Sequence, residues 1–526
     1  MQSASTPGTS ATSIIMGDVK VAVIGLGPAG LTAIKALREE GFDVQGFERR
    51  GCETVANSAF SDFPVPRDTL PVWPQMPGRN EFKGTVIHGQ SYREPKKYTG
   101  QRVLVVGLGN TACEVSLSVA REASCVYQSY RRGRIIISRY DDDGIPTDVE
   151  PWPETQLKYL LRHRLPWLAT RLEKRLLVKT MVSDVARHQV GDAGDSERRR
   201  RLRAEERIRG EWRLLPCPTE LVYPTVQDDF ISALFSRRIT PVRGFKAFAG
   251  PDKVLLDDGS TIRVDTIVFC TGYVLDFGIM PELEMDGSCG LPLKTAADQH
   301  KARAQAGEAK AQAGATREEP TLPRLYHMLF PPRWASSVAI MSWMSALETA
   351  WCVCELASTA VSQVWAADAA SKLKPGLLRP GTSASGGTHQ FHRKPARLPT
   401  EAEMNAAVDK YHAWWRRGWA KEPSAHPGLV QPYNFFRFLH GMAGTGMYEH
   451  VGHSLSLQNW ILWCKDRRLH RCLTRGPTSS HAWRVFETNP AGVPGCGRRV
   501  WPGARRAVQD AYEDFERYRR ERRANS

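Results

Sequence analysis

The fold class follows from one segment near the N-terminus, Val19-Lys-Val-Ala-Val-Ile-Gly25-Leu-Gly27-Pro-Ala-Gly30. Its first half is a short β-branched run that is typical of a buried strand, and helical spacing follows over residues 31–40. A second strand is predicted over residues 42–48, Phe-Asp-Val-Gln-Gly-Phe-Glu. A strand, a glycine turn, a helix and a strand in this order predict a βαβ unit.

The glycines of this turn suit a bound dinucleotide. Gly25 permits a tight turn, Gly27 lets the backbone approach a pyrophosphate, and Gly30 lets the helix pack closely on the strand. Glu48 follows at the end of the second strand, where its carboxylate can accept hydrogen bonds from ribose hydroxyls. A glycine turn without a ligand is the alternative, and the strand, the helix and Glu48 together weigh against it.

A second unit of the same design begins at the strand Arg102-Val-Leu-Val-Val106 and turns at Gly107-Leu-Gly109-Asn110-Thr-Ala112. Alanine replaces the third glycine, which is a tolerated variant. After a helix near 111–122 and a strand over 124–129, this unit ends in Tyr130-Arg131-Arg132 instead of a carboxylate. An arginine pairs with the 2′-phosphate of NADPH, whereas a carboxylate repels it. The first loop therefore suits FAD and the second suits NADPH, with a solvated turn as the alternative for the arginines.

Two dinucleotide folds in one chain imply a flavoprotein that a nicotinamide cofactor reduces by hydride transfer. The expected fold class is α/β, with two Rossmann-like domains, the NADPH domain inserted in the FAD domain, and a helical C-terminal region. This plan is common to several enzyme classes, and further motifs choose among them.

Three motifs choose one class. Residues 82–92, Phe-Lys-Gly-Thr-Val-Ile-His-Gly-Gln-Ser-Tyr, follow the pattern FxGxxxHxxxY; residues 60–64 read Phe-Ser-Asp-Phe-Pro; and Cys270-Thr271-Gly272-Tyr273 ends an apolar strand. Together with the two glycine loops, and in their order along the chain, these motifs resemble those of the flavin-containing monooxygenases, the class B enzymes similar to N,N-dimethylaniline monooxygenase. Tyr92 stands where the Baeyer–Villiger relatives are expected to have Trp.

The resemblance implies a reaction and further site residues. NADPH would reduce FAD, and O2 would then add at flavin C4a. A soft nucleophilic nitrogen or sulfur centre would take the distal oxygen of this C4a-hydroperoxyflavin. The family's Asn near the flavin matches Asn57 in Thr54-Val-Ala-Asn-Ser, which makes Asn57 the candidate catalytic residue. Thr271 and Gly272 are the candidate cofactor-binding residues of the third motif.

The resemblance breaks between the first loop and the motif at residues 82–92. Only 33 residues separate Glu48 from Phe82, and a βαβ crossover alone takes at least about 10–12 residues besides its strands. The family's GGxW segment after the acidic residue is also absent. We infer that segments of the FAD domain are lacking, and a mis-joined gene model or a splice product explains their loss beside intact motifs. Two alternative functions stay open: an NADPH oxidase or reductase that leaks peroxide, and a non-catalytic NADP(H)-binding protein.

Composition and local patterns set further expectations. Lys plus Arg exceed Asp plus Glu by 16, which favours anionic partners without selecting one. The basic run over residues 198–203 is interpreted as a solvated helix or loop, and no nucleic-acid partner is expected. Eleven cysteines without a CxxC motif indicate reduced thiols, no metal site and a cytoplasmic location. The apolar residues 334–364, interrupted by Glu348 and Glu355, predict a buried helix pair and no transmembrane segment.

Two features of the C-terminal region are assigned to the fold. Gly441-Met-Ala-Gly444-Thr-Gly446 follows a helical pattern and is interpreted as a turn. The aromatic residues over 411–419 are interpreted as helix packing, with a substrate-channel wall or a peripheral membrane contact as the alternative.

The substrate and the oligomeric state stay open. The expected domain layout is a disordered tail at 1–17, a truncated FAD-binding part at 18–97, the NADPH-binding domain at 98–235, a second FAD part at 236–290, a low-complexity linker at 291–320, a helical FAD continuation at 321–373, a linker at 374–398 and a helical C-terminal region at 399–526.

Overall fold

The computed structural model describes residues 18–48, 69–141, 144–147, 149–189, 196–219, 221–275, 277–286, 293–299, 301–302, 320–341, 343–346, 348–373, 394–423, 425–452, 456–489 and 492–525. The chain forms two compact units. The first unit comprises Met1–Pro64, Asp148–Pro166 and Pro281–Ser526, and the second comprises Val65–Thr147 and Trp167–Met280.

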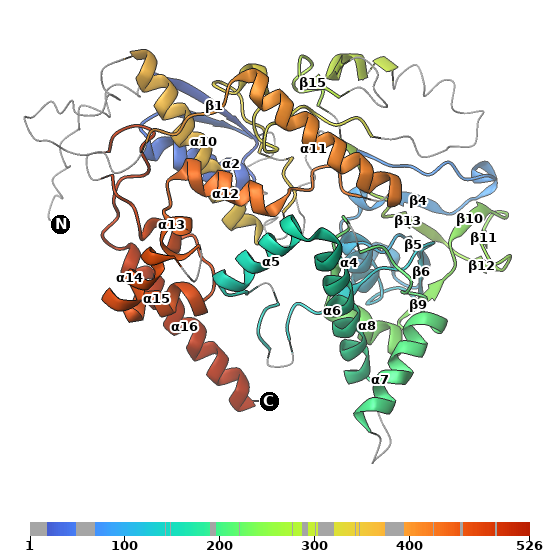
Figure 1. Ribbon diagram of the computed structural model, residues 1–526. Coiled ribbons are helices and arrows are strands. Elements are labelled where there is room, and N and C mark those ends of the chain that lie inside the picture. Colours follow the sequence, from blue (N-terminus) through green and yellow to red (C-terminus); the bar gives the residue numbers. More distant parts are fainter. Residues whose placement is uncertain are drawn as a thin grey trace, which may run out of the picture. The chain divides into compact units, whose positions relative to one another are not determined.

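The second unit is built on a five-stranded sheet in which every neighbouring pair of strands is parallel (Figure 1). Its order is β4-β13-β5-β6-β9, so strands distant in the sequence are neighbours. In the register, Val103 lies opposite Val126 on one side and Thr266 on the other. The strands are β4 (Thr85–His88), β5 (Arg102–Val106), β6 (Cys125–Ser129), β9 (Ile239–Val242) and β13 (Thr266–Phe269).

Both faces of this sheet are covered, which explains its nearly continuous apolar strands. Because successive side chains of a strand point to opposite faces, Val103 and Val105 pack in one core and Leu104 in another. The first core contains residues of α4 (Asn110–Val119), α6 (Pro166–Arg187), α7 (Glu197–Glu206) and α8 (Asp229–Phe235). The second core contains residues of the antiparallel sheet β10 (Phe245–Phe248), β11 (Lys253–Leu256) and β12 (Thr261–Arg263).

The helix, strand and hairpin predictions for this unit agree with its elements. The expected hairpin is β11 and β12, with Gly259 in the left-handed region at φ 83°. The basic run forms α7, a largely exposed helix. The short remaining elements are β3 (Thr69–Pro71) paired with β14 (Tyr273–Leu275), β7 (Ile136–Ile137) paired with β8 (Thr225–Val226), three 3₁₀ turns at Arg79–Glu81, Gly89–Ser91 and Pro95–Tyr98, and a π turn at Arg207–Glu211.

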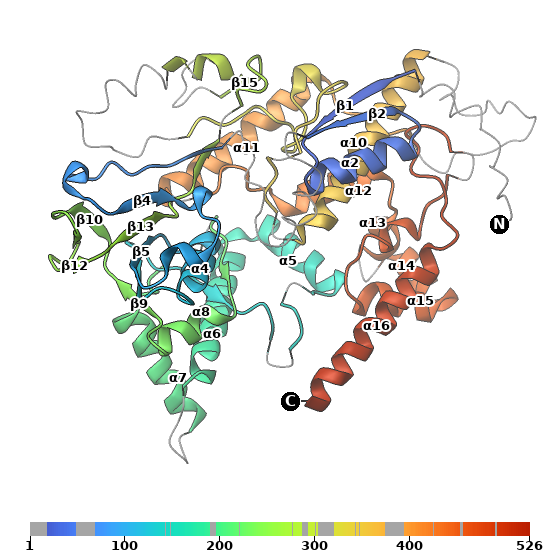
Figure 2. The ribbon, with the colours of Figure 1, turned by 180° about the vertical axis from the view of Figure 1, so that it is seen from behind.

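The first unit begins with the predicted βαβ unit. Strands β1 (Lys20–Ile24) and β2 (Asp43–Phe47) pair in parallel, and α2 (Pro28–Glu39) connects them. Helix α10 (Ala350–Leu373) lies against α2 (Figure 2). Ala366 and Ala370 of α10 join Leu37 and Val44 in one core. Small residues on α10 thus let it pack closely on the βαβ unit.

The rest of the first unit is mainly helical, as predicted for residues 399–526. Trp415 of the aromatic residues over 411–419 is fully buried, whereas Tyr411, Trp414 and Trp419 are half-buried. Gly444 at φ 77° ends α12 in the left-handed conformation, so the predicted turn over 441–446 begins at Gly444, and residues 441–443 are still helical. The helices are α5 (Trp152–Arg164), α11 (Glu401–Lys421), α12 (Pro432–Ala443), α13 (Met447–Val451), α14 (Leu457–Lys465), α15 (Arg467–Arg475) and α16 (Ala504–Asn525), with 3₁₀ turns at Pro332–Trp334 and Ala482–Arg484 and a strand pair β15 (Glu284–Met285) and β16 (Lys294–Thr295).

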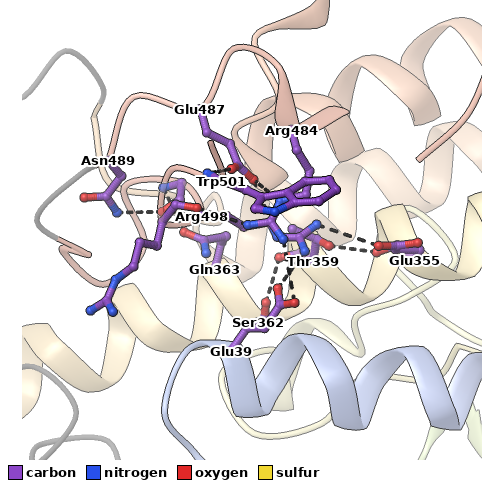
Figure 3. Close-up of polar contacts among 12 residues, drawn as sticks. Glu39, Glu355, Thr359, Ser362, Gln363, Arg484, Glu487, Asn489, Arg498 and Trp501 are labelled. Carbon is purple, nitrogen blue, oxygen red and sulfur yellow. Dashed lines mark hydrogen bonds and ion pairs between the residues drawn. The ribbon is translucent and has the colours of Figure 1, made fainter. Parts of the chain in front are cut away.

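A buried polar cluster ties the C-terminal segment to α2 and α10 (Figure 3). The Arg498 guanidinium lies 2.6 Å from the Glu39 carboxylate and 3.8 Å from that of Glu487. The Glu487 carboxylate, 2% exposed, also accepts a 2.7 Å bond from Arg484. Gln363 of α10 accepts a 2.8 Å bond from the backbone N–H of Gly497. The charges are therefore paired where they are withdrawn from water, as buried charges require.

Two expectations differ from the structure. The predicted helix pair over 334–364 is wrong: α10 is the one long helix there among the described residues. Before it, Ser345 forms backbone hydrogen bonds with Gly428 and Val430, which hold the segment extended. Residues 69–97 and 236–280, expected with the FAD domain, lie in the second unit because β4 and β13 hydrogen-bond within its parallel sheet. The 1–17 tail and most of both linkers lie outside the described residues.

Within the part of the chain that the structure describes, no helix is long and apolar enough to cross a membrane.

Candidate functional site

The first glycine loop, residues 25–30, connects β1 to α2. The backbone N–H of Gly25 donates to the carbonyl of Phe47, the last residue of β2, at 2.8 Å. Gly25 has φ 91°, a left-handed conformation that favours glycine. At the start of α2 the N–H of Leu31 donates to the carbonyl of Gly27 at 3.0 Å. The loop therefore turns sharply at the carboxyl end of the strand pair and leads directly into the helix.

Gly30 brings the helix against the loop. A Cβ atom added to Gly30 would lie 1.9 Å from the carbonyl oxygen of Gly25, so no larger residue fits. Glu48 lies beside the same loop: its carboxylate accepts a 2.9 Å hydrogen bond from the N–H of Leu26. The structure thus brings Gly25, Gly27, Gly30 and Glu48 together, with the carboxylate of Glu48 against the loop at the end of β2.

The second glycine loop, residues 107–112, repeats this geometry between β5 and α4. The N–H of Gly107 donates to the carbonyl of Ser129, the last residue of β6, at 2.9 Å. The N–H of Cys113 donates to the carbonyl of Gly109 at 3.0 Å. Gly107 has φ 135°, and a Cβ atom there would lie 2.5 Å from the carbonyl oxygen of Cys270. Gly109 has no neighbour within 4 Å of an added Cβ, which leaves its outer face open.

The N-termini of helices α2 and α4 both lack a side-chain cap. Gly27 caps α2 and Gly109 caps α4, and neither cap makes a side-chain hydrogen bond to the helix. Neither first turn contains an acidic residue. Unpaired N–H groups and the positive end of the helix dipole make such an end favourable for a pyrophosphate.

Buried polar side chains that the sequence reasoning missed support the second loop. Gln128 of β6 donates from its amide to the Gly107 carbonyl at 2.5 Å and also contacts the hydroxyl of Ser116. The hydroxyl of Thr225 donates to the Leu108 carbonyl at 3.0 Å. The one signal in the sequence for Gln128 was a glutamine within an apolar strand. Thr225 gave no signal, because it lies more than a hundred residues from the loop in the sequence.

The predicted site residue Asn110 also supports the second loop through its side chain. Its side-chain oxygen accepts a 3.0 Å hydrogen bond from the N–H of Val226, so Asn110 fastens the loop to β8. Ala112 is fully buried under the turn. These contacts fix the loop before any ligand binds, which is what preorganised binding requires.

The arginines after β6 are exposed. Arg131 lies over Gly244, where its Cγ would be 2.6 Å from an added Cβ. Tyr130 is anchored through its hydroxyl, which donates to the carbonyl of Trp212. Burial raises the pKa of Tyr130 above its ordinary value, so it stays a neutral hydrogen-bond donor. The backbone next to Arg131 is therefore anchored two residues after Ser129, whose carbonyl accepts the hydrogen bond from Gly107.

The third motif adjoins the second loop at the end of β13. The hydroxyl of Thr271 donates to the carbonyl of Val72 at 2.5 Å, and the N–H of Val72 donates to the carbonyl of Gly272 at 3.0 Å. Gly272 has φ 87°, which explains the glycine. His88 of β4 is 2% exposed and its ring lies 5.1 Å from that of Tyr273. Burial lowers the pKa of His88, so its imidazole is neutral at pH 7.

The predicted residues thus form two groups, Gly25, Gly27, Gly30 and Glu48 in the first unit and Gly107, Gly109, Asn110, Ala112, Arg131, Thr271 and Gly272 in the second. Asn57 and the residues 60–64 lie outside the described residues. Among the residues that are described, no cluster of three or more His, Cys, Asp or Glu could hold a metal ion. The open space at Gly109 and the uncapped N-termini of α2 and α4 fit the pyrophosphate of a dinucleotide in each unit.

Comparison with known proteins finds similarity to flavin monooxygenases. A family model described as flavin-binding monooxygenase-like matches residues 63–286. Monooxygenase aurF of Gibberella zeae is 26% identical over 94% of this chain and 97% of its own length. The alignment spans 591 positions, more than the 526 residues of this chain, so part of aurF has no counterpart here.

Other relatives match over a shorter range. Human flavin-containing monooxygenase 3 is 29% identical over 39% of this chain, which spans about a third (34%) of that protein. Among solved structures, cyclohexanone monooxygenase from a Rhodococcus species, bound to NADP+, aligns with 15% identity and a TM-score of 0.44 over 81% of this chain and 98% of that one.

Two Rossmann-like folds with loops of this build define the class of FAD- and NADPH-dependent flavoproteins. Residues 63–286 match the flavin-binding monooxygenase-like family, and the chain is similar to monooxygenase aurF and to the flavin-containing monooxygenases.

Proposed function

We propose that this chain uses NADPH and O2 to oxygenate a soft nucleophilic nitrogen or sulfur centre, such as a tertiary amine or a thioether. One observation carries the proposal: the two loops share the same hydrogen bonds at their turns, yet the strand paired with the first is followed by Glu48, whose carboxylate contacts the loop, and the strand paired with the second is followed by the exposed Arg131. The two electrostatic environments favour different dinucleotides, one with free ribose hydroxyls and one with a 2′-phosphate.

Each residue then has a defined task. The bare N-terminus of α2 holds the FAD pyrophosphate while Glu48 accepts the ribose hydroxyls. The N-terminus of α4 holds the NADPH pyrophosphate, and Arg131 pairs with the 2′-phosphate. Thr271 and Gly272 are assigned to the edge of the second loop, and Asn57 to the flavin. The flavin supplies the redox chemistry, while the protein binds, orients and excludes water.

The setting that we propose is the cytoplasm. The described cysteines are free thiols, in keeping with a reducing compartment. The partners are the small amine or sulfide and O2, and no step requires a nucleic acid.

Flavin content and substrate-dependent NADPH consumption test the proposal. The purified full chain should carry near-stoichiometric flavin absorbance and should consume NADPH faster when a thioether or a tertiary amine is added. Arg131→Gln should raise the KM for NADPH about tenfold or more while the KM for NADH stays nearly unchanged, because only NADPH carries the 2′-phosphate. NADPH consumption that ignores the substrate and releases peroxide would identify an oxidase instead.

A non-catalytic NADP(H)-binding protein is the second candidate, and a specific observation favours it. The sheet that carries the first loop has two strands among the described residues, whereas the sheet of the second loop has five. A colourless chain that binds NADPH, even after incubation with excess FAD, would establish this candidate.

A further inference from the structure

A groove of about 690 Å³ lies in the second unit between α6 and α7, away from both glycine loops along the chain. The two helices lie side by side (Figures 1 and 2). Their inner residues, including Met181, Val185 and Ala204, belong to the buried core of the unit, so the groove has a firm base.

The interior of the groove is apolar. Val178 and Val182 of α6 and Leu202 of α7 line it, and Leu202 is 58% exposed to solvent. Val178 and Val182 pack against the core beneath them. A hydrocarbon chain placed here would cover apolar surface that now faces water. The burial would contribute a favourable free energy of about 25 cal/mol per Å² of apolar surface.

The rim of the groove is strongly positive. Six cations and two carboxylates line it, and both carboxylates already have arginine partners. Glu197 pairs with Arg201 at 2.7 Å, and Glu205 pairs with Arg209 at 2.9 Å. The side chains of the other five rim cations form no ion pair or hydrogen bond with any residue in the described ranges; they are Arg171, Lys174, Arg175, Lys179 and Arg198.

We propose that this groove binds a single-chain anionic amphiphile, represented by a long-chain carboxylate. The hydrocarbon chain would lie on Val178, Val182 and Leu202, and the carboxylate would pair with Lys174, Lys179 or their arginine neighbours. The volume falls within the roughly 300–1,000 Å³ typical of sites for one small molecule, which favours this ligand over a bilayer or a protein helix. The site is independent of the proposed monooxygenase reaction.

Isothermal titration of the full chain with dodecanoate, below its micelle concentration, tests the site. We expect saturable binding with one ligand per chain. Affinity should rise by up to about fourfold per added methylene from octanoate to dodecanoate. It should fall with salt, because the rim cations are exposed and are screened. Dodecanol and dodecyltrimethylammonium should bind at least tenfold more weakly, because they lack the negative charge.

Matched variants locate the site. Lys174→Gln/Lys179→Gln should weaken dodecanoate binding about three- to tenfold, which is the effect of losing two exposed ion pairs. Lys96→Gln/Lys246→Gln, two exposed lysines elsewhere in the same unit, make the same change of charge and should leave binding unaltered. Leu202→Asn should flatten the dependence on chain length.

Several results would overturn the proposal. One is dodecanol binding as tightly as dodecanoate, and another is an equal effect of the two double variants. A third is binding of the chain to phosphatidylglycerol vesicles or to an acidic peptide with no binding of monomeric dodecanoate, which would assign the groove to a membrane or a protein partner.

Discussion

The two glycine loops differ at their last position, and one contact explains the difference. At Gly30 a Cβ atom would lie 1.9 Å from a backbone carbonyl oxygen, whereas Ala112 is accommodated beneath Gly107. The clash at Gly30 involves backbone atoms, which cannot move aside without displacing the turn. The two loops therefore follow one pattern, but the last position of the first loop requires glycine whereas that of the second accepts alanine.

Replacement of Gly30 should be costly in spite of its helical position. Alanine usually stabilises a helix by about 1 kcal/mol relative to glycine, but Gly30→Ala should lower the free energy of unfolding by about 1–3 kcal/mol through overpacking. Urea denaturation and the flavin content of the purified protein measure the effect. Ala112→Gly is the control: it should cost about 1 kcal/mol and leave the KM for NADPH within a few-fold. A stable, flavin-replete Gly30→Ala protein would show that this loop does not turn as described.

Arg498 pairs with three carboxylates, so its loss should be severe. Arg498→Met leaves Glu39, Glu355 and Glu487 without this partner, and removal of one member of a buried ion-pair group costs about 3–5 kcal/mol. Thermal unfolding provides the measurement. Arg506→Met, which removes an 87% exposed arginine 3.6 Å from Asp510, should change stability by less than about 1 kcal/mol. Equal losses in the two variants would contradict the structural role of the cluster.

Glu40, next to this cluster, should make stability depend on pH. Burial raises the pKa of Glu40 to about 7, against the partial opposition of Arg498. Below the unfolded pKa near 4.5 Glu40 is protonated in both states. Between pH 4.5 and 7 the folded chain retains a proton that the unfolded chain releases, so stability falls as pH rises, by up to about 1.4 kcal/mol per pH unit.

The comparison with Glu40→Gln isolates this effect. The variant should gain stability relative to the parent protein as pH rises from 4.5 to 7 and hold that gain above pH 7. Glu521→Gln, at an exposed position of α16, should follow the parent protein throughout. A constant difference between Glu40→Gln and the parent across this range would refute the raised pKa.

Among the helices, the end of α12 tests the interpretation of residues 441–446 as a turn. Gly444 ends the helix at φ 77°, where a side chain is strained, whereas Gly441 lies inside it with nothing within 4 Å of an added Cβ. Gly444→Ala should therefore destabilise the protein by about 1 kcal/mol, and Gly441→Ala should stabilise it by up to about 1 kcal/mol. The two melting temperatures should move in opposite directions; a shared direction would be inconsistent with the helix end.

Helix α10 shows how a single element can be misjudged from its composition. Its small and apolar residues extend the apolar pattern of the preceding segment, and together they predicted two helices. The backbone of Ser345 instead pairs with Gly428 and Val430, which lie far along the chain. Such a pairing leaves no periodic signal in either segment.

For the chain as a whole, each nucleotide should slow hydrogen exchange in the unit that binds it. NADP+ at about 100 times its Kd should stabilise the state that binds it by about 2.7 kcal/mol. Hydrogen exchange should therefore slow over β5 and α4 with NADP+, and over β1 and α2 with FAD. The peptides over 401–421, distant in sequence from both loops, provide an internal reference. Protection of β1 and α2 by NADP+ with none at β5 and α4 would exchange the proposed assignments.

Local sequence was sufficient for both βαβ units, for their glycine turns and for the contrast between Glu48 and Arg131. Each of these signals lies within about thirty residues, where β-branched runs, glycines and helical spacing act through backbone sterics and short-range hydrogen bonds. The order of the strands, the support of the second loop by Gln128 and Thr225, and the groove between α6 and α7 came from packing. So did the ion pair of Glu39 with Arg498, 459 residues apart. Contacts over such separations depend on which surfaces meet when the chain folds, and no pattern within either segment specifies that meeting.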